Sequence, residues 1–375
     1  MMASTYRPPF AVHPGAHLDE KLDELGMSQA ELARRTGLSQ KHISQLISGE
    51  ASLSPRTALL LERVTKMPAS LWNNLESRWV TYQAALEESS HLEDHTDWAS
   101  NFPIKEMKKR QLIDPTAKSG RLVGELLTFF GIGSIDSWDA TYEKVAAAMY
   151  RTARSANRNS YAVATWLREA ELQAGQIEVH PFEATRAKGL PAELREVTRH
   201  ATHANEWWPQ LVSRFAEAGI ALVMVPEYPA LTKLAGASRW LTPNKAMIAL
   251  TGRGKRADML WFTLLHELGH VILHQKKQTY INIEDGAADD PQESEADRFA
   301  AKSLIPGPIE AELNTVPSGS LQAAVQFAHR TGLHPSIVIG RLHHEQRLPP
   351  NYGIKKYFER LDLNDSYWTV ANRTN

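Results

Sequence analysis

The chain contains no cysteine. This absence excludes disulfide bonds and metal sites built on thiolates. The chain also lacks any apolar run of about 18 residues, the length that a transmembrane helix requires, and its opening segment, Met1 to Arg7, has no apolar stretch of the kind that directs export. We therefore expect a cytoplasmic protein with no membrane partner.

A strong charge of one sign is absent as well. The formal net charge is −1 over 375 residues, and between Ala16 and Val80 eight Lys and Arg balance eight Asp and Glu. The bulk basic signature of a nucleic-acid-binding protein is therefore missing. With a hydrophobic content of 42%, a chain of this length can bury two or three compact cores.

The most informative segment is His266-Glu267-Leu268-Gly269-His270, which lies in an otherwise apolar stretch. On a helix, His266 and His270 are one turn apart on the same face, and the apolar surroundings predict that this helix is buried. Two buried imidazoles need partners, and a zinc ion would satisfy both, while Glu267 would hold an attacking water. The alternative is a core helix whose histidines bond to backbone carbonyls, so a third ligand must be found.

Three downstream residues are candidates for that third ligand. His274 continues the four-residue spacing, but it lies two turns from His266, about 12 Å along the helix axis, which is too far for one ion. Glu293 and Glu295 remain, in a segment whose start at Asp290 has the pattern of a helix N-cap.

The helical phase of this segment separates the two glutamates. Glu293 and Asp297 share a face with several alanines, whereas Glu295 falls beside Arg298 and Lys302 and is explained by solvated ion pairs. Two carboxylates on a core face need a cation or strong donors. A capping box would explain Glu293 alone and leaves Asp297 unexplained. We therefore predict Glu293 as the third zinc ligand and Asp297 as the residue that orients a ligand histidine.

Four segments together resemble the ImmA/IrrE family of metallopeptidases: 236–240, 246–250, 261–274 and 293–300. The resemblance covers roughly residues 200 to 345. It implies a Zn²⁺-dependent endopeptidase that cleaves a protein partner such as a repressor and so switches genes on. It also implies that His266, His270 and Glu293 hold the metal and that Glu267 is the general base.

The segment 28–49 predicts a helix-turn-helix. Ser28 is placed to cap a first helix, Gly37 to make the tight turn and Ser39 to cap a second helix. Between these signals, apolar residues recur at helical spacing and would bury the junction of the two helices. The pattern also fits an ordinary helical hairpin, so DNA binding does not follow from it alone.

Polar side chains face outward on the predicted second helix, namely Gln40, Lys41, Ser44 and Gln45. These residue types suit base edges, because Gln can pair with adenine and Lys with guanine. At the start of the first helix, Gln29 could bond a backbone phosphate.

The stretch from His13 to Trp79 is similar to HigA-type antitoxin repressors of the Xre class. The resemblance implies a five-helix helix-turn-helix domain that binds palindromic operator DNA as a homodimer. It also keeps open a second function from another class, a non-catalytic antitoxin and autorepressor that binds operator DNA and a toxin.

These observations predict a mostly α fold with a smaller α+β part. The α+β part is zincin-like, with the HExxH helix and a small sheet that includes short buried strands at 220–225 and 247–250. The predicted divisions are an Xre-type helix-turn-helix domain (1–86), a helical middle region (87–200), the zinc peptidase domain (201–350) and a C-terminal tail (351–375).

Overall fold

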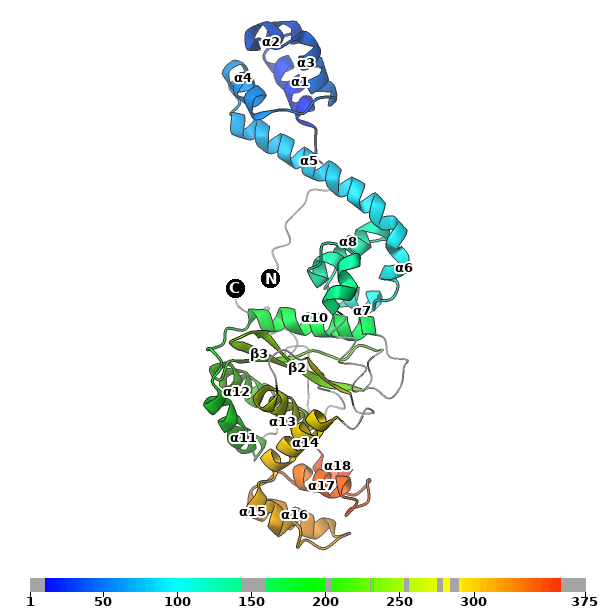
Figure 1. Cartoon of the computed structure of the whole chain (residues 1–375), viewed down its shortest axis with the longest axis vertical. Helices are drawn as coiled ribbons and strands as arrows, with labels where there is room; N and C mark the ends of the chain where they lie inside the picture. The colour runs from blue at the N-terminus through cyan, green and yellow to red at the C-terminus, as the bar shows by residue number, and fades with distance from the viewer. Residues whose placement is uncertain are drawn as a thin grey trace. The chain divides into compact units, whose positions relative to one another are not determined.

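The computed structural model describes residues 11–142, 160–199, 204–229, 231, 233–252, 256–274, 279–283 and 290–358 (Figure 1). The chain forms two compact units, one made of residues 1–96 and 117–124 and the other of residues 97–116 and 125–375. The division of the sequence at 86, 200 and 350 is finer than this and stays a prediction.

Five helices form most of the first unit, as predicted. They are α1 (Pro14–Glu24), α2 (Gln29–Thr36), α3 (Gln40–Ser48), α4 (Pro55–Thr65) and the long α5 (Ala69–Leu92) (Figure 1). Their core contains side chains with no exposed surface, among them Leu18, Leu32, Ile43, Leu61 and Trp72. Each helix contributes one of them, and α1, α3 and α4 each add a second buried apolar residue three or four positions away. Burial of one apolar stripe per helix therefore accounts for the bundle.

The helix-turn-helix is formed by α2 and α3, and its local signals act as the sequence predicts. The Ser28 hydroxyl accepts a hydrogen bond from the backbone N–H of Glu31 at 3.2 Å, and that of Ser39 accepts one from the N–H of His42 at 3.1 Å. Between the helices Gly37 has φ +74°, a left-handed conformation that glycine adopts without steric cost.

Close packing of α1 on α3 depends on a glycine. A Cβ atom at Gly15 would lie 2.2 Å from the carbonyl oxygen of Leu46 and 2.5 Å from that of Ile47. Both distances are below van der Waals contact, and both neighbours are backbone atoms that cannot rotate away. Any larger residue at this position must therefore push α1 off α3.

The second unit contains a four-stranded sheet in its described part. The strands β1 (Ile220–Met224), β2 (Leu234–Thr242), β3 (Lys245–Leu250) and β4 (Tyr280–Ile283) lie in the order β1-β3-β2-β4. β1 is parallel to β3, and β2 is antiparallel to both β3 and β4. All five residues of β1 are buried, as expected for a strand covered on both faces.

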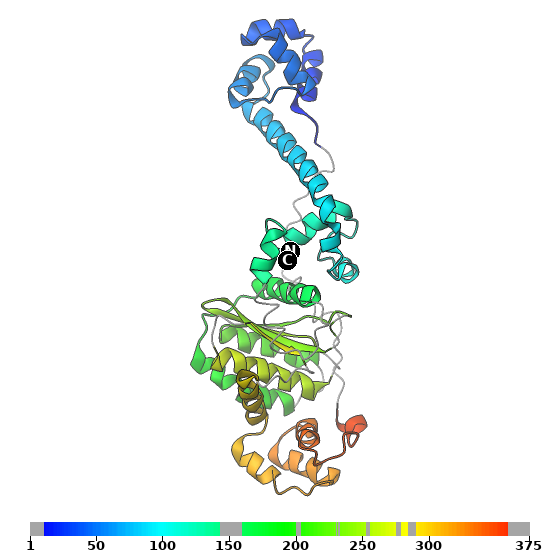
Figure 2. The same cartoon turned by 45° about the vertical axis from the view of Figure 1, so that its right-hand side comes forward.

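Helices cover both faces of this sheet (Figures 1 and 2). α10 (Ser160–Gln176) lies on one face, and α11 (Ala184–Arg199), α12 (Ala204–Glu217), α13 (Ala257–Leu273) and α14 (Pro291–Leu304) lie on the other. Further along the chain come α15 (Gly307–Leu313), α16 (Leu321–Thr331), α17 (Pro335–His344) and α18 (Ile354–Tyr357). One core, with Trp208, Trp261, Phe215 and Phe327, runs through this side of the sheet.

The region between α5 and α10 is helical in its described residues, with a 3₁₀ turn (Glu93–His95), α6 (Thr96–Ala99), α7 (Ile104–Lys109) and α8 (Ser119–Phe130). Just after α7, the Arg110 guanidinium contacts the Glu169 carboxylate at 3.1 Å and donates to the carbonyl oxygens of Pro226 and Glu227 at 3.0 and 3.1 Å. The segment that follows β1 is thereby held against α7 and α10. No helix among the described residues is long and apolar enough to cross a membrane.

Candidate functional site

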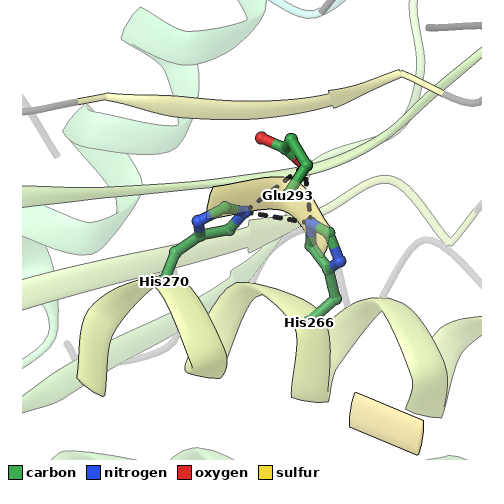
Figure 3. A group of neighbouring side chains, drawn as sticks. All are labelled: His266, His270 and Glu293. Atoms are coloured by element: carbon green, nitrogen blue, oxygen red, sulfur yellow. Dashed lines mark hydrogen bonds and ion pairs between the residues drawn. The ribbon is translucent and has the colours of Figure 1, made fainter. Parts of the chain in front are cut away.

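Three side chains from two helices converge beside the sheet. His266 and His270 project from one face of α13, and Glu293 reaches them from the first turn of α14 (Figure 3). The Glu293 Oε2 atom lies 3.1 Å from Nε2 of His266 and 3.5 Å from Nε2 of His270, and the two Nε2 atoms are 3.0 Å apart. The structure thus brings together the three residues that the sequence analysis selected as ligands.

These separations fit a shared divalent ion. With zinc–nitrogen bonds of about 2.0–2.1 Å, the ligand atoms of a tetrahedral zinc site are about 3.3 Å apart. Both imidazoles are almost completely buried, and two unprotonated nitrogens facing each other at 3.0 Å would repel without a cation or a proton between them. The donor set, two imidazoles and one carboxylate, is also one that zinc accepts.

The electrostatics keep Glu293 charged. Burial would raise the pKa of Glu293, but hydrogen bonds from His266 and His270 lower it to about 2. Burial lowers the pKa of His266, but its hydrogen bonds to Asp297 and Glu293 outweigh this and raise that pKa to about 10. For His270 burial is the largest effect, and its pKa is lowered. Without a metal, His266 is therefore protonated and bonded to the Glu293 carboxylate, and a bound ion would take the place of that proton.

The Asp297 carboxylate lies on the other side of the His266 ring. Its Oδ1 atom is 2.8 Å from Nδ1 of His266, so the Nε2 atom is left facing Glu293 and His270. The predicted burial of Asp297 on the core face is wrong, because its side chain is 60% exposed. The carboxylate reaches the buried ring from the rim of the site, which explains how a solvated residue contacts a nearly inaccessible histidine.

The Glu267 side chain is completely buried next to His266. Neither of its carboxyl oxygens makes a hydrogen bond of good geometry within the described part of the chain. Burial raises its pKa to about 8, although His266 and the nearby Ser238 hydroxyl act in the opposite direction. Strand β2 lies against it, since a Cβ atom at Gly236 would be 3.2 Å from its Oε1 atom. Buried carboxylate oxygens without partners are rare, and they mark a position where water or substrate is expected.

Gly269, inside the HExxH motif, sets the spacing of the two helices. A Cβ atom at this position would lie 3.2 Å from the Cα atom of Ala296 and 3.2 Å from Cδ1 of Phe299. α14 therefore approaches α13 as closely as a residue without a side chain permits. Because Glu293 is on the same helix as Ala296, this approach carries its carboxylate to the histidines.

The sequence analysis did not predict the contacts of three neighbours with this cluster. His274 had been set aside as a ligand, and it contacts His270 instead, with 2.9 Å between their Nδ1 atoms. Its Nε2 atom is 3.2 Å from Oε2 of Glu295. The Tyr280 ring, from β4, stacks on His270 with 4.1 Å between the ring centres. The spacing of His274 from His270 was an available signal for the first contact, whereas no local pattern pointed to Tyr280.

The predicted pairing of Glu295 with Arg298 and Lys302 is wrong. Besides the contact of Glu295 with His274, the Arg298 guanidinium donates to the backbone carbonyl of Ser294 at 3.1 Å. The alternative explanation of Glu293, a capping box, is not formed either. Its carboxylate bonds to the histidines, while Asp290 caps α14 by accepting from the N–H of Gln292 at 2.9 Å.

The residues predicted to read DNA lie on the outer surface of the helix-turn-helix. Gln40, Lys41 and Ser44 are exposed on α3, and Gln45 and Gln29 are half-buried. Apolar residues of the same helix, Ile43 and Leu46, are buried against the bundle. α3 thus has one face in the core and a polar face directed to solvent.

Two regions of the chain match known families. Residues 18–72 match the helix-turn-helix family, and residues 229–345 match the IrrE N-terminal-like domain. A curated relative from Escherichia coli K12, an uncharacterised HTH-type transcriptional regulator named YddM, is 35% identical over 71 residues, which are 19% of this chain and 76% of that protein. The chain belongs to the HTH-type transcriptional regulators, and it combines their DNA-binding domain with a metallopeptidase-like domain.

Solved structures similar to this chain include two proteins of the HigA type. An addiction module antidote protein of the HigA family from Coxiella burnetii is 26% identical, covers 22% of this chain and 91% of its own, and has a TM-score of 0.21. The antitoxin HigA of Pseudomonas aeruginosa, solved with the higBA promoter, is 29% identical, covers 23% of this chain and 94% of its own, and has a TM-score of 0.22.

Proposed function

We propose that this protein is an operator-binding regulator whose C-terminal domain is a zinc-dependent endopeptidase that cleaves a protein partner, such as a repressor. The observation that carries the proposal is the convergence of His266, His270 and Glu293 within reach of one ion, with the fully buried carboxyl group of Glu267 beside them. A structural zinc site needs four protein ligands, whereas three ligands and a neighbouring base are typical of a catalytic site.

The residues of the site have different roles in the proposed reaction. His266, His270 and Glu293 would hold the ion, and Asp297 would fix the His266 ring by accepting a hydrogen bond from its Nδ1–H. Bound zinc supplies the Lewis acidity that acidifies water and polarises a peptide carbonyl. Glu267 takes the proton of the attacking water and returns it to the leaving amine.

The amino-terminal unit supplies the second half of the function. Gln40, Lys41, Ser44 and Gln45 of α3 would contact base edges in the major groove, and Gln29 would bond a phosphate. Operator binding places the protein at the genes that its proteolytic activity controls. By analogy with other helix-turn-helix regulators, a homodimer would match a palindromic site.

The experiment that tests the peptidase is the Glu267→Gln substitution. The variant is expected to bind zinc as the wild type does, measured by elemental analysis, and to lose all cleavage, because only the base is removed. Proteomes of wild-type and Glu267→Gln cells would then reveal the substrate as a protein that disappears only in the wild type. Cleavage by the purified variant would remove Glu267 from the mechanism.

The same comparison separates the peptidase from a non-catalytic antitoxin. If the wild-type protein holds no zinc and no cellular protein depends on Glu267, the C-terminal domain acts only by binding. A toxin recovered with both forms of the protein would then support the antitoxin function.

A further inference from the structure

The end of α13 continues into a row of hydrogen-bonded side chains that leads away from the candidate zinc site. The Nδ1 atom of His270, on the side of the ring opposite Glu293, lies 2.9 Å from Nδ1 of His274, and Nε2 of His274 lies 3.2 Å from Oε2 of Glu295. The row therefore runs from a predicted zinc ligand through a second imidazole to a carboxylate of α14.

The proton positions in this row follow from its last member. An ionised carboxylate only accepts hydrogen bonds, so His274 must donate to Glu295 through Nε2–H. A neutral imidazole carries one proton, and the Nδ1 atom of His274 is then an acceptor. The Nδ1 atom of His270 must be the donor to it, which leaves the Nε2 lone pair of His270 directed at the point shared with His266 and Glu293.

We propose that His274 and Glu295 form a relay that fixes His270 in the tautomer required for metal binding. The inference rests on the proposed zinc site and adds two positioning residues to it. Each predicted ligand histidine then has a carboxylate of α14 behind it, Asp297 directly behind His266 and Glu295 behind His270 through His274.

The local backbone places His274 for this role. α13 ends at Leu273, and His274 has φ −112° and ψ 174°, so its backbone has left the helix while its N–H still bonds to the carbonyl of His270. Any residue could make that backbone bond. The side chain, only 3% exposed, is turned to His270, and a buried imidazole needs partners for both of its nitrogens.

The Tyr280 ring packs against the two imidazoles of this row, His270 and His274. It stacks on His270 at 16° between ring planes, and its hydroxyl donates to Oε1 of Gln292 at 3.2 Å. The His274 ring lies 5.4 Å from the same tyrosine. Both imidazoles are thus confined against one aromatic face, and the hydrogen bond between them keeps its geometry.

A pair of substitutions at one position tests the relay. In His274→Leu the acceptor is removed, whereas in His274→Asn the side-chain carbonyl can take the place of Nδ1 and accept from His270. Zn²⁺ affinity of the full-length protein would be measured by competition with a chelating dye at fixed pH. We expect binding to weaken about 10- to 100-fold in His274→Leu, the usual loss when a partner of a ligand histidine is removed, and to return close to the wild-type value in His274→Asn.

A spectroscopic readout separates positioning from general packing. Nitrogen NMR of the metal-free protein is expected to show His270 protonated at Nδ1 in the wild type and in His274→Asn, and a mixture of tautomers in His274→Leu. Glu295→Ala should give a smaller loss of Zn²⁺ affinity than His274→Leu, because Glu295 is 50% exposed and water can replace its carboxylate. His344→Leu, at an exposed histidine of α17, is the control and should change neither readout.

The outcomes distinguish the relay from the zinc site itself. If the wild type binds one Zn²⁺ and His274→Leu binds it as tightly with an unchanged His270 tautomer, the relay is overturned and the zinc site stands. The relay is also overturned if His274→Asn is as impaired as His274→Leu. A wild type that binds no Zn²⁺ would overturn both the relay and the proposed function.

Discussion

The two candidate sites of this chain are constructed in opposite ways. In the helix-turn-helix, the polar residues of α3 lie on its solvent-facing surface while the helix is anchored by apolar residues on its other side. In the peptidase-like domain, His266, Glu267 and His270 are buried, and their neighbours come from α14 and β4. One site is a surface carried by a folded element, and the other is part of the folded core.

This difference has an energetic consequence. Side chains at an exposed surface contribute nearly independently, and their loss has little effect on the fold. Buried polar groups share partners, so the loss of one leaves another unsatisfied. We therefore expect large, coupled effects in the peptidase-like domain and small, separable effects in the helix-turn-helix.

The largest effect is expected for Glu293→Ala, which removes one of three ligands. Zn²⁺ affinity should fall by more than the roughly 100-fold seen when only a supporting residue is lost, because the charged donor itself is gone. Glu312→Ala, at an exposed glutamate that pairs with Arg330 on the surface, is the matched control. DNA binding measured on the same variant should not change, and a parallel loss would contradict the separation of the two sites.

Gly15→Ala is expected to have the next largest effect, and it tests the anchoring of the DNA-reading helix rather than its surface. The added methyl would meet the carbonyl of Leu46, so α1 and α3 must separate, at a cost of about 1–3 kcal/mol. Hydrogen exchange of the α1 and α3 amides should accelerate in the full-length protein. Gly175→Ala, a helical glycine with open space around it, should be neutral or stabilising, as alanine is in a helix interior.

Lys41→Ala is expected to weaken operator binding about tenfold without changing the fold. If Lys41 contacts guanine as predicted, the loss is confined to sites that carry this base, at about 1–3 kcal/mol per contact. A uniform loss over all sequences, with a salt dependence shallower by about one charge, would assign Lys41 to a phosphate instead. Binding to sites selected from a random DNA library measures both. Lys302→Ala, in the other unit, controls for the change in net charge.

The smallest effect is expected for Ser39→Ala, which removes the N-cap of α3. The N–H of His42 loses its acceptor, and the first unit should lose about 1 kcal/mol of unfolding free energy. Denaturant unfolding followed by signals of the first unit would measure it. Ser48→Ala, near the other end of the same helix, should be nearly neutral, since that hydroxyl is exposed and bonds only to a carbonyl of its own helix.

The features that could be predicted from the sequence depend on residues close to one another in the chain. The caps at Ser28 and Ser39, the turn at Gly37 and the pairing of His266 with His270 all depend on residues within one or two helical turns. The choice of Glu293 over Glu295 also came from helical phase, and the structure brings Glu293 to the two histidines. The mostly helical fold with a small sheet is confirmed for the same reason.

The side-chain contacts that could not be predicted depend on where the helices end and on how they pack against each other. Glu295 was assigned to ion pairs on its own helix, but the end of α13 at Leu273 turns His274 toward it. The helical phase predicted Asp297 in the core, yet its side chain is 60% exposed and contacts His266 from the rim of the site. Tyr280 comes from β4, where it pairs with Ser238 of β2, and pairing between strands so far apart in the sequence leaves no periodic pattern in it.

Gly269 links the chemistry of the candidate zinc site to the packing of the domain. A side chain at Gly269 would press on Ala296 and Phe299, so this glycine permits the short distance between α13 and α14. The same distance separates the histidines from the Glu293 carboxylate. If α13 and α14 were moved apart by the thickness of a methyl group, the distances from the Glu293 carboxylate to the two histidines would increase by a similar amount. We therefore expect ion selectivity at the candidate zinc site to depend in part on residues that never touch the ion, and Phe299 is the first of them.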